Sequence, residues 1–80
     1  MKNQDHSVVW MKDYGYIRIK LNEILKEKGI SRNQIAQAIG SRFEVINKWC
    51  NGSVEKIDAD VLARLCFVLQ CKVEDIIEYL

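Results

Sequence analysis

Short runs of apolar residues, spaced three and four positions apart, are the feature that most constrains how this chain can fold. Five such runs follow one another between Leu21 and Leu80. Residues at this spacing lie on one face of an α-helix. Gly29, Gly40 and Gly52 close the first three runs, and glycine readily adopts the left-handed conformation that ends many helices. The pattern predicts five short helices, the last of them reaching Leu80.

Capping residues stand before three of the expected helices. Residues 31–34 (SRNQ) and 41–44 (SRFE) match the capping box, in which a serine and a side chain three residues later each bond the other's backbone N–H. Asp58 precedes the fourth run and can accept from backbone N–H groups at a helix start. These signals predict three helix starts directly after the capping residues.

Residues 1–20 lack the helical spacing. Residues 16–20 (YIRIK) alternate apolar and polar side chains, which is the period of a β-strand. Residues 7–11 (SVVWM) could form a second strand, with residues 12–15 as the turn. A two-stranded hairpin alone is marginal in water, so it would have to pack on the helices or pair with another subunit. The alternative is a frayed tail.

The composition bounds the size and class of the fold. The chain has 80 residues, 49% of them hydrophobic, which is enough for one modest core. It contains no proline and four glycines, which favours helices over a turn-rich β-fold. We expect an all-α domain over residues 17–80, preceded by an N-terminal arm or strand segment over residues 1–16.

Cysteine and histidine usage disfavours a metal site and an oxidising compartment. Cys50, Cys66 and Cys71 show no Cys-x-x-Cys spacing, and their odd number indicates reduced, buried thiols in a cytoplasmic protein. His6 is the single histidine, so no structural zinc is expected. The longest apolar runs have five residues. A membrane-spanning helix needs ~20, and the N-terminus also lacks the apolar stretch of a signal peptide.

An enzymatic function is not indicated. The sequence shows no nucleophile with a matching base, no cluster of metal ligands and no phosphate-binding loop. A chain of this size can hardly enclose a substrate pocket. We therefore expect no catalytic residues and no cofactor.

Charge is distributed unevenly along the chain. Residues 17–53 hold seven basic and three acidic side chains, whereas residues 54–80 hold three basic and six acidic ones. The net charge of the whole chain is only +1. A basic middle beside an acidic end favours one face that meets a polyanion and another turned away from it. An ordinary solvated surface is the alternative.

Residues 32–52 carry the most informative spacing. Ala36 stands four residues before Gly40, and Ile46 stands six residues after it. Where two helices cross steeply their axes come close, and a small residue facing a branched apolar one allows this. The exposed face of the second helix then stays free to enter a DNA major groove, which is wide enough to admit a helix.

The stretch SRNQIAQAIGSRFEVINKWCNG resembles the helix-turn-helix of the lambda-repressor-like, or Cro/CI-type, regulators of the XRE family. The resemblance extends from about Ile17 to Leu80, and VLARLCFVLQCKVEDIIEYL is similar to the last two helices of small stand-alone members from bacteria and mobile elements. It implies a five-helix lambda-repressor-like domain and a sequence-specific transcriptional regulator, in the simplest case a repressor.

The resemblance also implies roles for individual residues. Arg32 and Asn51 match positions that contact DNA phosphates. The helix expected over residues 42–50 matches the one that enters the major groove. Its base-reading positions are Arg42, Phe43, Glu44, Asn47 and Lys48.

Each base-reading residue has its own chemistry and an alternative. Arg42 could bind guanine and Asn47 adenine, both bidentately. Phe43 could pack on thymine methyl groups or close the core instead. Glu44 could accept from cytosine, but a carboxylate near phosphate is repelled, so a capping role competes. Arg42 and Lys48 could be plain surface charge.

The chain departs from the family pattern at two positions. Many members bury an arginine on the first helix against a glutamate near the end of the third, where this chain has Leu25 and Cys50. Replacing a buried ion pair with apolar residues is often neutral or stabilising. Cys50 is therefore expected in the core, with a redox-sensing role as the alternative. Because Phe43 and Glu44 replace the commoner amides, no known operator can be carried over.

The expected partner is double-stranded DNA, bound by a homodimer. One helix-turn-helix covers a few base pairs, and two placed ~34 Å apart match one helical turn. The dimer surface could involve Ile77, Tyr79 and Leu80, or the strands that carry Trp10 and Tyr16. The alternative is a protein-binding module, such as the antitoxin of a toxin–antitoxin pair, in which the N-terminal aromatic residues hold a small protein partner.

Overall fold

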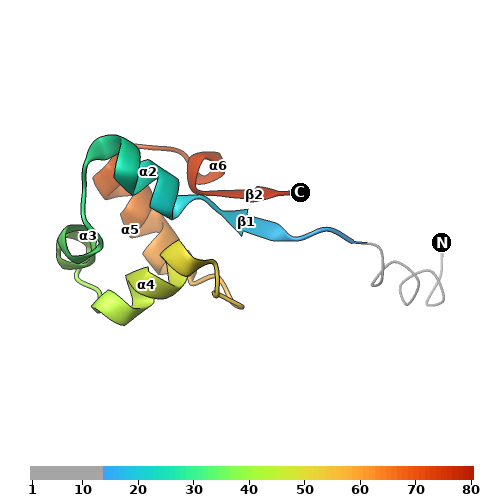
Figure 1. Cartoon of the computed structure of the whole chain (residues 1–80), viewed down its shortest axis with the longest axis horizontal. Coiled ribbons are helices and arrows are strands. Elements are labelled where there is room, and N and C mark those ends of the chain that lie inside the picture. The colour runs from blue at the N-terminus through green and yellow to red at the C-terminus, as the bar shows by residue number, and fades with distance from the viewer. Residues whose placement is uncertain (1–13) are drawn as a thin grey trace.

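The computed structural model describes residues 14–80 (Figure 1). It confirms the five predicted helices and contains two short strands. In chain order the elements are β1 (Ile17–Ile19), α2 (Leu21–Lys28), α3 (Arg32–Ile39), α4 (Phe43–Asn51), α5 (Ala59–Leu69), α6 (Val73–Ile76) and β2 (Ile77–Tyr79). None of the helices in the described residues is long and apolar enough to cross a membrane.

Two of the three predicted helix starts have the expected caps. Ser31 forms the capping box with Gln34 at the start of α3, and the Asp58 carboxylate accepts from Asp60 and Val61 at the start of α5. Each satisfies backbone N–H groups that have no partner inside the helix. These caps explain why α3 and α5 begin where they do.

The predicted capping box at residues 41–44 is wrong. Helix α4 begins at Phe43 with Arg42 as its N-cap, and no side chain caps it. The reason is that Ser41 completes the end of α3: Gly40 has a positive φ of 70°, and the Ser41 N–H donates to the Ala36 carbonyl at 2.8 Å. This is the hydrogen-bond pattern of a Schellman motif. Helix α4 therefore starts one residue later than predicted.

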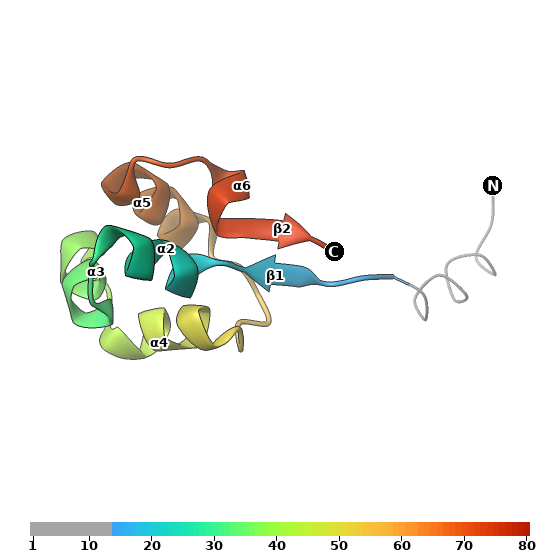
Figure 2. The same cartoon turned by 45° about the horizontal axis from the view of Figure 1, so that its top comes forward.

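The helix predicted to reach Leu80 is wrong beyond Ile76. Residues Ile77–Tyr79 form β2, which pairs antiparallel with β1 so that Ile19 faces Ile77 and Ile17 faces Tyr79. The strand predicted within residues 16–20 is confirmed as β1, but its partner comes from the other end of the domain. The partner predicted at residues 7–11 lies outside the described residues. We call this pair the β1–β2 ribbon, and it projects from the helices in Figures 1 and 2.

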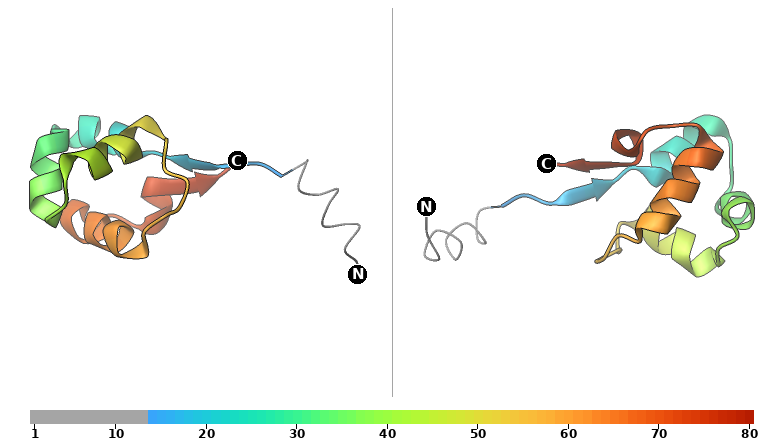
Figure 3. Two further views of the ribbon diagram at one scale, coloured as in Figure 1. Left: turned by 90° about the horizontal axis from the view of Figure 1, so that it is seen from below. Right: turned by 180° about the vertical axis from the view of Figure 1, so that it is seen from behind.

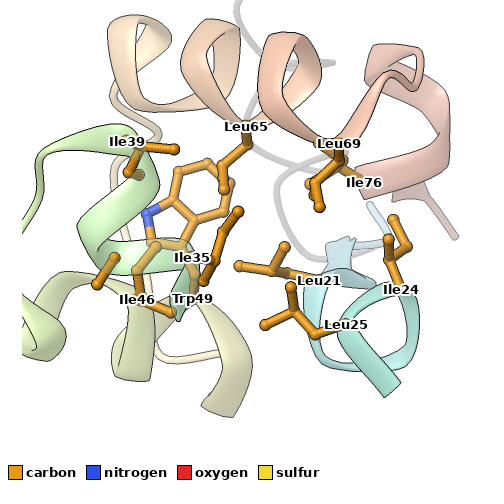
Figure 4. Close-up of a cluster of buried hydrophobic side chains, with 11 residues drawn as sticks. Leu21, Ile24, Leu25, Ile35, Ile39, Ile46, Trp49, Leu65, Leu69 and Ile76 are labelled. Carbon is orange, nitrogen blue, oxygen red and sulfur yellow. The ribbon is translucent and has the colours of Figure 1, made fainter. Parts of the chain in front are cut away.

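The core lies between the helices and contains apolar side chains only. Figure 4 shows side chains of α2, α3, α4 and α5 pointing toward one another, with Ile76 of α6 beside Leu69. The buried residues are Leu21, Ile24, Leu25, Ile35, Ala36, Ile39, Ile46, Trp49, Leu65, Leu69 and Ile76. No charged or polar residue within 14–80 is buried.

The two departures from the family pattern are part of this apolar packing. Leu25 is buried, and Cys50 is half-buried against the core. Burial raises the pKa of the Cys50 thiol, and the nearby positive charge of Arg32 opposes that rise. An uncharged thiol is therefore the favoured form of Cys50, as expected of a core residue.

Candidate functional site

Helices α3 and α4 are joined by a tight turn at Gly40 and Ser41. Ala36 and Ile46 are both buried, as expected for a close crossing of the two helices. The Arg64 guanidinium of α5 donates to the Ile39 carbonyl at 2.8 Å. This bond satisfies a carbonyl that α3 leaves free at its end. Packing and hydrogen bonding thus fix the angle between the two helices.

Helix α4 buries one face and exposes the other. Ile46 and Trp49 point into the core. Arg42, Glu44 and Lys48 are exposed, and Phe43 keeps 43% of its surface accessible. Because Phe43 is exposed, it does not close the core. Glu44 does not cap the helix, and its carboxylate forms no ion pair within residues 14–80. Helix α4 faces the viewer in the left panel of Figure 3.

The guanidinium of Arg32, the first residue of α3, lies among three asparagine side chains. Its Nη1 donates to Oδ1 of Asn47 and, at 3.4 Å, to Oδ1 of Asn51, both on α4. Its Nη2 donates to Oδ1 of Asn22 on α2 at 3.3 Å. We call Asn22, Arg32, Asn47 and Asn51 the Arg32 cluster. It ties α2, α3 and α4 together at the surface.

The basic side chains of residues 17–53 fall into two groups. Arg18 pairs with Glu23 and with Glu78, the second pair at 3.1 Å, and Lys20 lies 3.6 Å from Glu78. In contrast, Arg32, Arg42 and Lys48, like Lys26 and Lys28 of α2, form no ion pair within residues 14–80. Charge on α3 and α4 is therefore left uncompensated, whereas charge beside the ribbon is partly neutralised.

The structure brings the sequence-predicted residues together in two places. Arg42, Phe43 and Glu44 lie at the start of α4 with Lys48 one turn on, and Arg32 and Asn51 lie in the Arg32 cluster. Asn47, which is predicted to read a base, accepts a hydrogen bond from Arg32. Sequence reasoning missed Asn22 and Arg64, because no spacing or motif marks either of them. The described residues contain no group of three or more metal-ligating side chains.

Comparison with known proteins agrees with this geometry. The family model of the Cro/C1-type HTH DNA-binding domain matches residues 20–80. A solved structure from Bacteroides fragilis, described as "a putative DNA-binding protein", superposes with a TM-score of 0.70 and 19% identity. The match covers 79% of this chain and 100% of that one, and at this identity it shows a shared fold alone. No curated protein matches the chain.

Proposed function

The chain belongs to the Cro/C1-type helix-turn-helix DNA-binding domains, and from this premise we propose that it is a sequence-specific transcriptional repressor that inserts α4 into the major groove. The observation that carries the proposal is the division of α4 into a buried apolar face and an exposed face bearing Arg42, Phe43, Glu44 and Lys48. A helix held this way can present side chains to base edges.

The exposed face of α4 can donate hydrogen bonds to bases, accept hydrogen bonds from them and pack against their apolar groups. Arg42 and Lys48 can donate to guanine O6 and N7, Glu44 can accept from the amino group of cytosine, and Phe43 can pack on thymine methyl groups. Glu44 is available for this role because it has no capping partner. These four residues are the proposed determinants of sequence preference.

Phosphate contacts position the helix without reading sequence. We assign them to Arg32 and Asn51, which lie 3.4 Å apart between Nη1 and Oδ1. Arg32 also stands at the N-terminus of α3, where the helix dipole favours an anion. Bidentate contact between Asn47 and adenine needs the amide oxygen, which here accepts from Arg32.

We further propose that the protein acts as a dimer on two half-sites. Two copies are needed because one helix-turn-helix covers few base pairs. The β1–β2 ribbon supports this, since Tyr16, Ile17, Tyr79 and Leu80 are exposed on it, and aromatic side chains are enriched in protein interfaces. Residues 17–80 would form the DNA-binding domain of a bacterial, cytoplasmic repressor, with residues 1–16 as an arm.

The exposed aromatic residues also favour a second function. Tyr14, Tyr16 and Tyr79 lie on or beside the ribbon and are each more than half exposed. Aromatic side chains are enriched in protein interfaces. A small protein partner, as in an antitoxin, could bind there while α4 binds DNA.

Selection from a random pool of DNA duplexes at two salt concentrations tests the main proposal. A dimeric regulator enriches a near-palindrome with half-sites about 10 base pairs apart, and its affinity falls steeply with salt. If no sequence is enriched and no duplex binds at low salt, the DNA-binding proposal is refuted. Co-purification of a small protein would then favour the second function.

A further inference from the structure

We propose that Asn22 and Asn47 complete, with Arg32 and Asn51, a single binding site for one phosphate group of the DNA backbone. Helix α2 would then contact DNA, and Asn47 would contact the DNA backbone and not a base. This inference rests on the proposed function, because it assigns further contacts to the same DNA. The hydrogen bonding and the charge of the Arg32 cluster both support it.

The hydrogen bonds fix the orientation of the three amides. A guanidinium has only donors, so each asparagine must turn its oxygen toward Arg32 and its NH₂ group away. The oxygens of Asn22, Asn47 and Asn51 all accept from Arg32. Each amide therefore keeps its N–H donors for another acceptor. The cluster presents a surface of donors around a cation, which suits the oxygen atoms of a phosphate.

The ligands of Arg32 leave its charge intact. Asn22, Asn47 and Asn51 are neutral, and Arg32 forms no ion pair in the part of the chain that the structure describes. Arg18 provides the contrast, because Glu23 and Glu78 both pair with it. Arg18 is thus held by groups that cancel its charge, whereas Arg32 is held by groups that orient it and leave it cationic.

The position of the cluster fits a backbone contact. Arg32, Asn22 and Asn47 are partly buried, whereas Asn51 is exposed, so the guanidinium has limited freedom but reaches the surface. Holding the side chain in place before binding lowers the entropy that DNA binding costs. Asn51 and Lys48 are both on α4, three residues apart, and neighbours at this spacing share one side of a helix. The cluster therefore borders the surface proposed to read bases.

Isosteric aspartate variants test the assignment. Asn22→Asp and Asn47→Asp each place a carboxylate beside Arg32, where it cancels the charge that a phosphate would meet. We expect affinity for the selected site and for a scrambled duplex to fall by the same factor, roughly tenfold or more near 0.1 M salt. The slope of log K against log salt should lose about one unit.

Asn33→Asp is the matched control. Asn33 is exposed on the first turn of α3, and no hydrogen bond joins it to Arg32 within residues 14–80. It makes the same change of charge beside the same helix terminus. We expect less than about a threefold loss of affinity and an unchanged salt slope, because no phosphate contact is removed.

Two results would overturn the inference. One is an Asn47→Asp variant that alters the ratio between selected and scrambled duplexes while the salt slope stays unchanged, which would make Asn47 a base reader. The other is an Asn22→Asp variant that binds as well as Asn33→Asp, which would exclude α2. In both cases wild-type binding remains intact and the proposed function survives. Wild-type protein that binds no duplex would overturn both proposals.

Serine variants keep the test decisive if an aspartate variant fails to fold in a thermal-unfolding assay. Asn22→Ser and Asn47→Ser remove the amide donors without adding charge. We expect them to lose affinity for both duplexes equally, by a smaller factor than the aspartates. Serine variants that bind both duplexes as tightly as wild type would refute the cluster as a phosphate site.

Discussion

The α3–α4 unit and the β1–β2 ribbon are built in opposite ways. Helices α3 and α4 are neighbours in sequence, joined by a three-residue turn (residues 40–42) and packed through buried residues such as Ala36 and Ile46. The ribbon joins segments 60 residues apart, as in the pairing of Arg18 with Glu78. Local signals specify the first, whereas the second depends on contacts between segments far apart in the sequence.

The two regions also differ in what they expose. The α3–α4 unit exposes charged and polar side chains over an apolar anchor, whereas the ribbon exposes Tyr16, Ile17 and Tyr79 and neutralises its charges in ion pairs. A polyanion suits the first surface and another protein surface suits the second. In the proposed function, DNA recognition and assembly therefore fall on separate elements of one small domain.

The largest expected effect comes from opening the helix crossing. Ile46→Ala removes a fully buried side chain between α3 and α4, and we expect a loss of about 2–5 kcal/mol in the free energy of unfolding. Urea unfolding followed by circular dichroism measures it. Val45→Ala, at a half-buried position on the same helix, is the control and should cost less. Equal losses would contradict a tightly packed crossing.

The next effect separates base reading from phosphate contact. Arg42→Ala should cost about 1–3 kcal/mol of binding at its preferred base and change which sequence is selected. Arg32→Ala should weaken all duplexes nearly equally and reduce the salt slope by about one. Fluorescence anisotropy titrations with selected and scrambled duplexes distinguish the two variants. If Arg42→Ala behaves like Arg32→Ala, the proposed groove-facing surface is wrong.

A smaller effect tests the ribbon as the surface of assembly. Tyr79→Ser removes an exposed aromatic side chain and its hydrogen bond from the Gly15 N–H, which should cost no more than about 1 kcal/mol of stability. We expect it to shift the protein from dimer to monomer in sedimentation experiments. Phe67→Ser on α5 is the matched control, because Phe67 is 76% exposed and lies beside Ala38 and Ile39 of α3, not on the ribbon. If only Phe67→Ser dissociates the dimer, the interface is on α5.

The contrast between the two regions also explains which features could be predicted from sequence. Glycines at helix ends and the caps Ser31 and Asp58 act over three or four residues, so the positions of α2 to α5 followed from local patterns. The cap predicted at Ser41 was wrong because this residue is typical both of the end of one helix and of the start of the next. Its backbone N–H bonds the end of α3. Residues 77–79 carry helical spacing and also alternate, and only pairing with β1 decides between them.

One part of the candidate site could be predicted from local sequence patterns, and the other part could not. The exposed face of α4 was predictable, because its apolar residues Ile46 and Trp49 mark which side is buried. The Arg32 cluster was not, because the contact between Asn22 and Arg32 depends on how α2 packs beside α3. The spacing of apolar residues in a sequence does not predict a hydrogen bond between two polar side chains on different helices.

The smallest expected effect concerns Cys50, which lies next to the Arg32 cluster. Burial raises the pKa of Cys50 in the folded chain above the ordinary thiol value of 9.0. Between 9.0 and that raised pKa, the folded chain holds a proton that the unfolded chain has lost. Stability should therefore fall as the pH rises through this window and stay lower above it. Urea unfolding near neutral pH and near pH 10 measures the loss.

Because the pKa of Cys71 is also raised, the comparison uses a background of Cys66→Ala and Cys71→Ala, with and without Cys50→Ala. A pH dependence that persists without Cys50 would place the titrating group elsewhere.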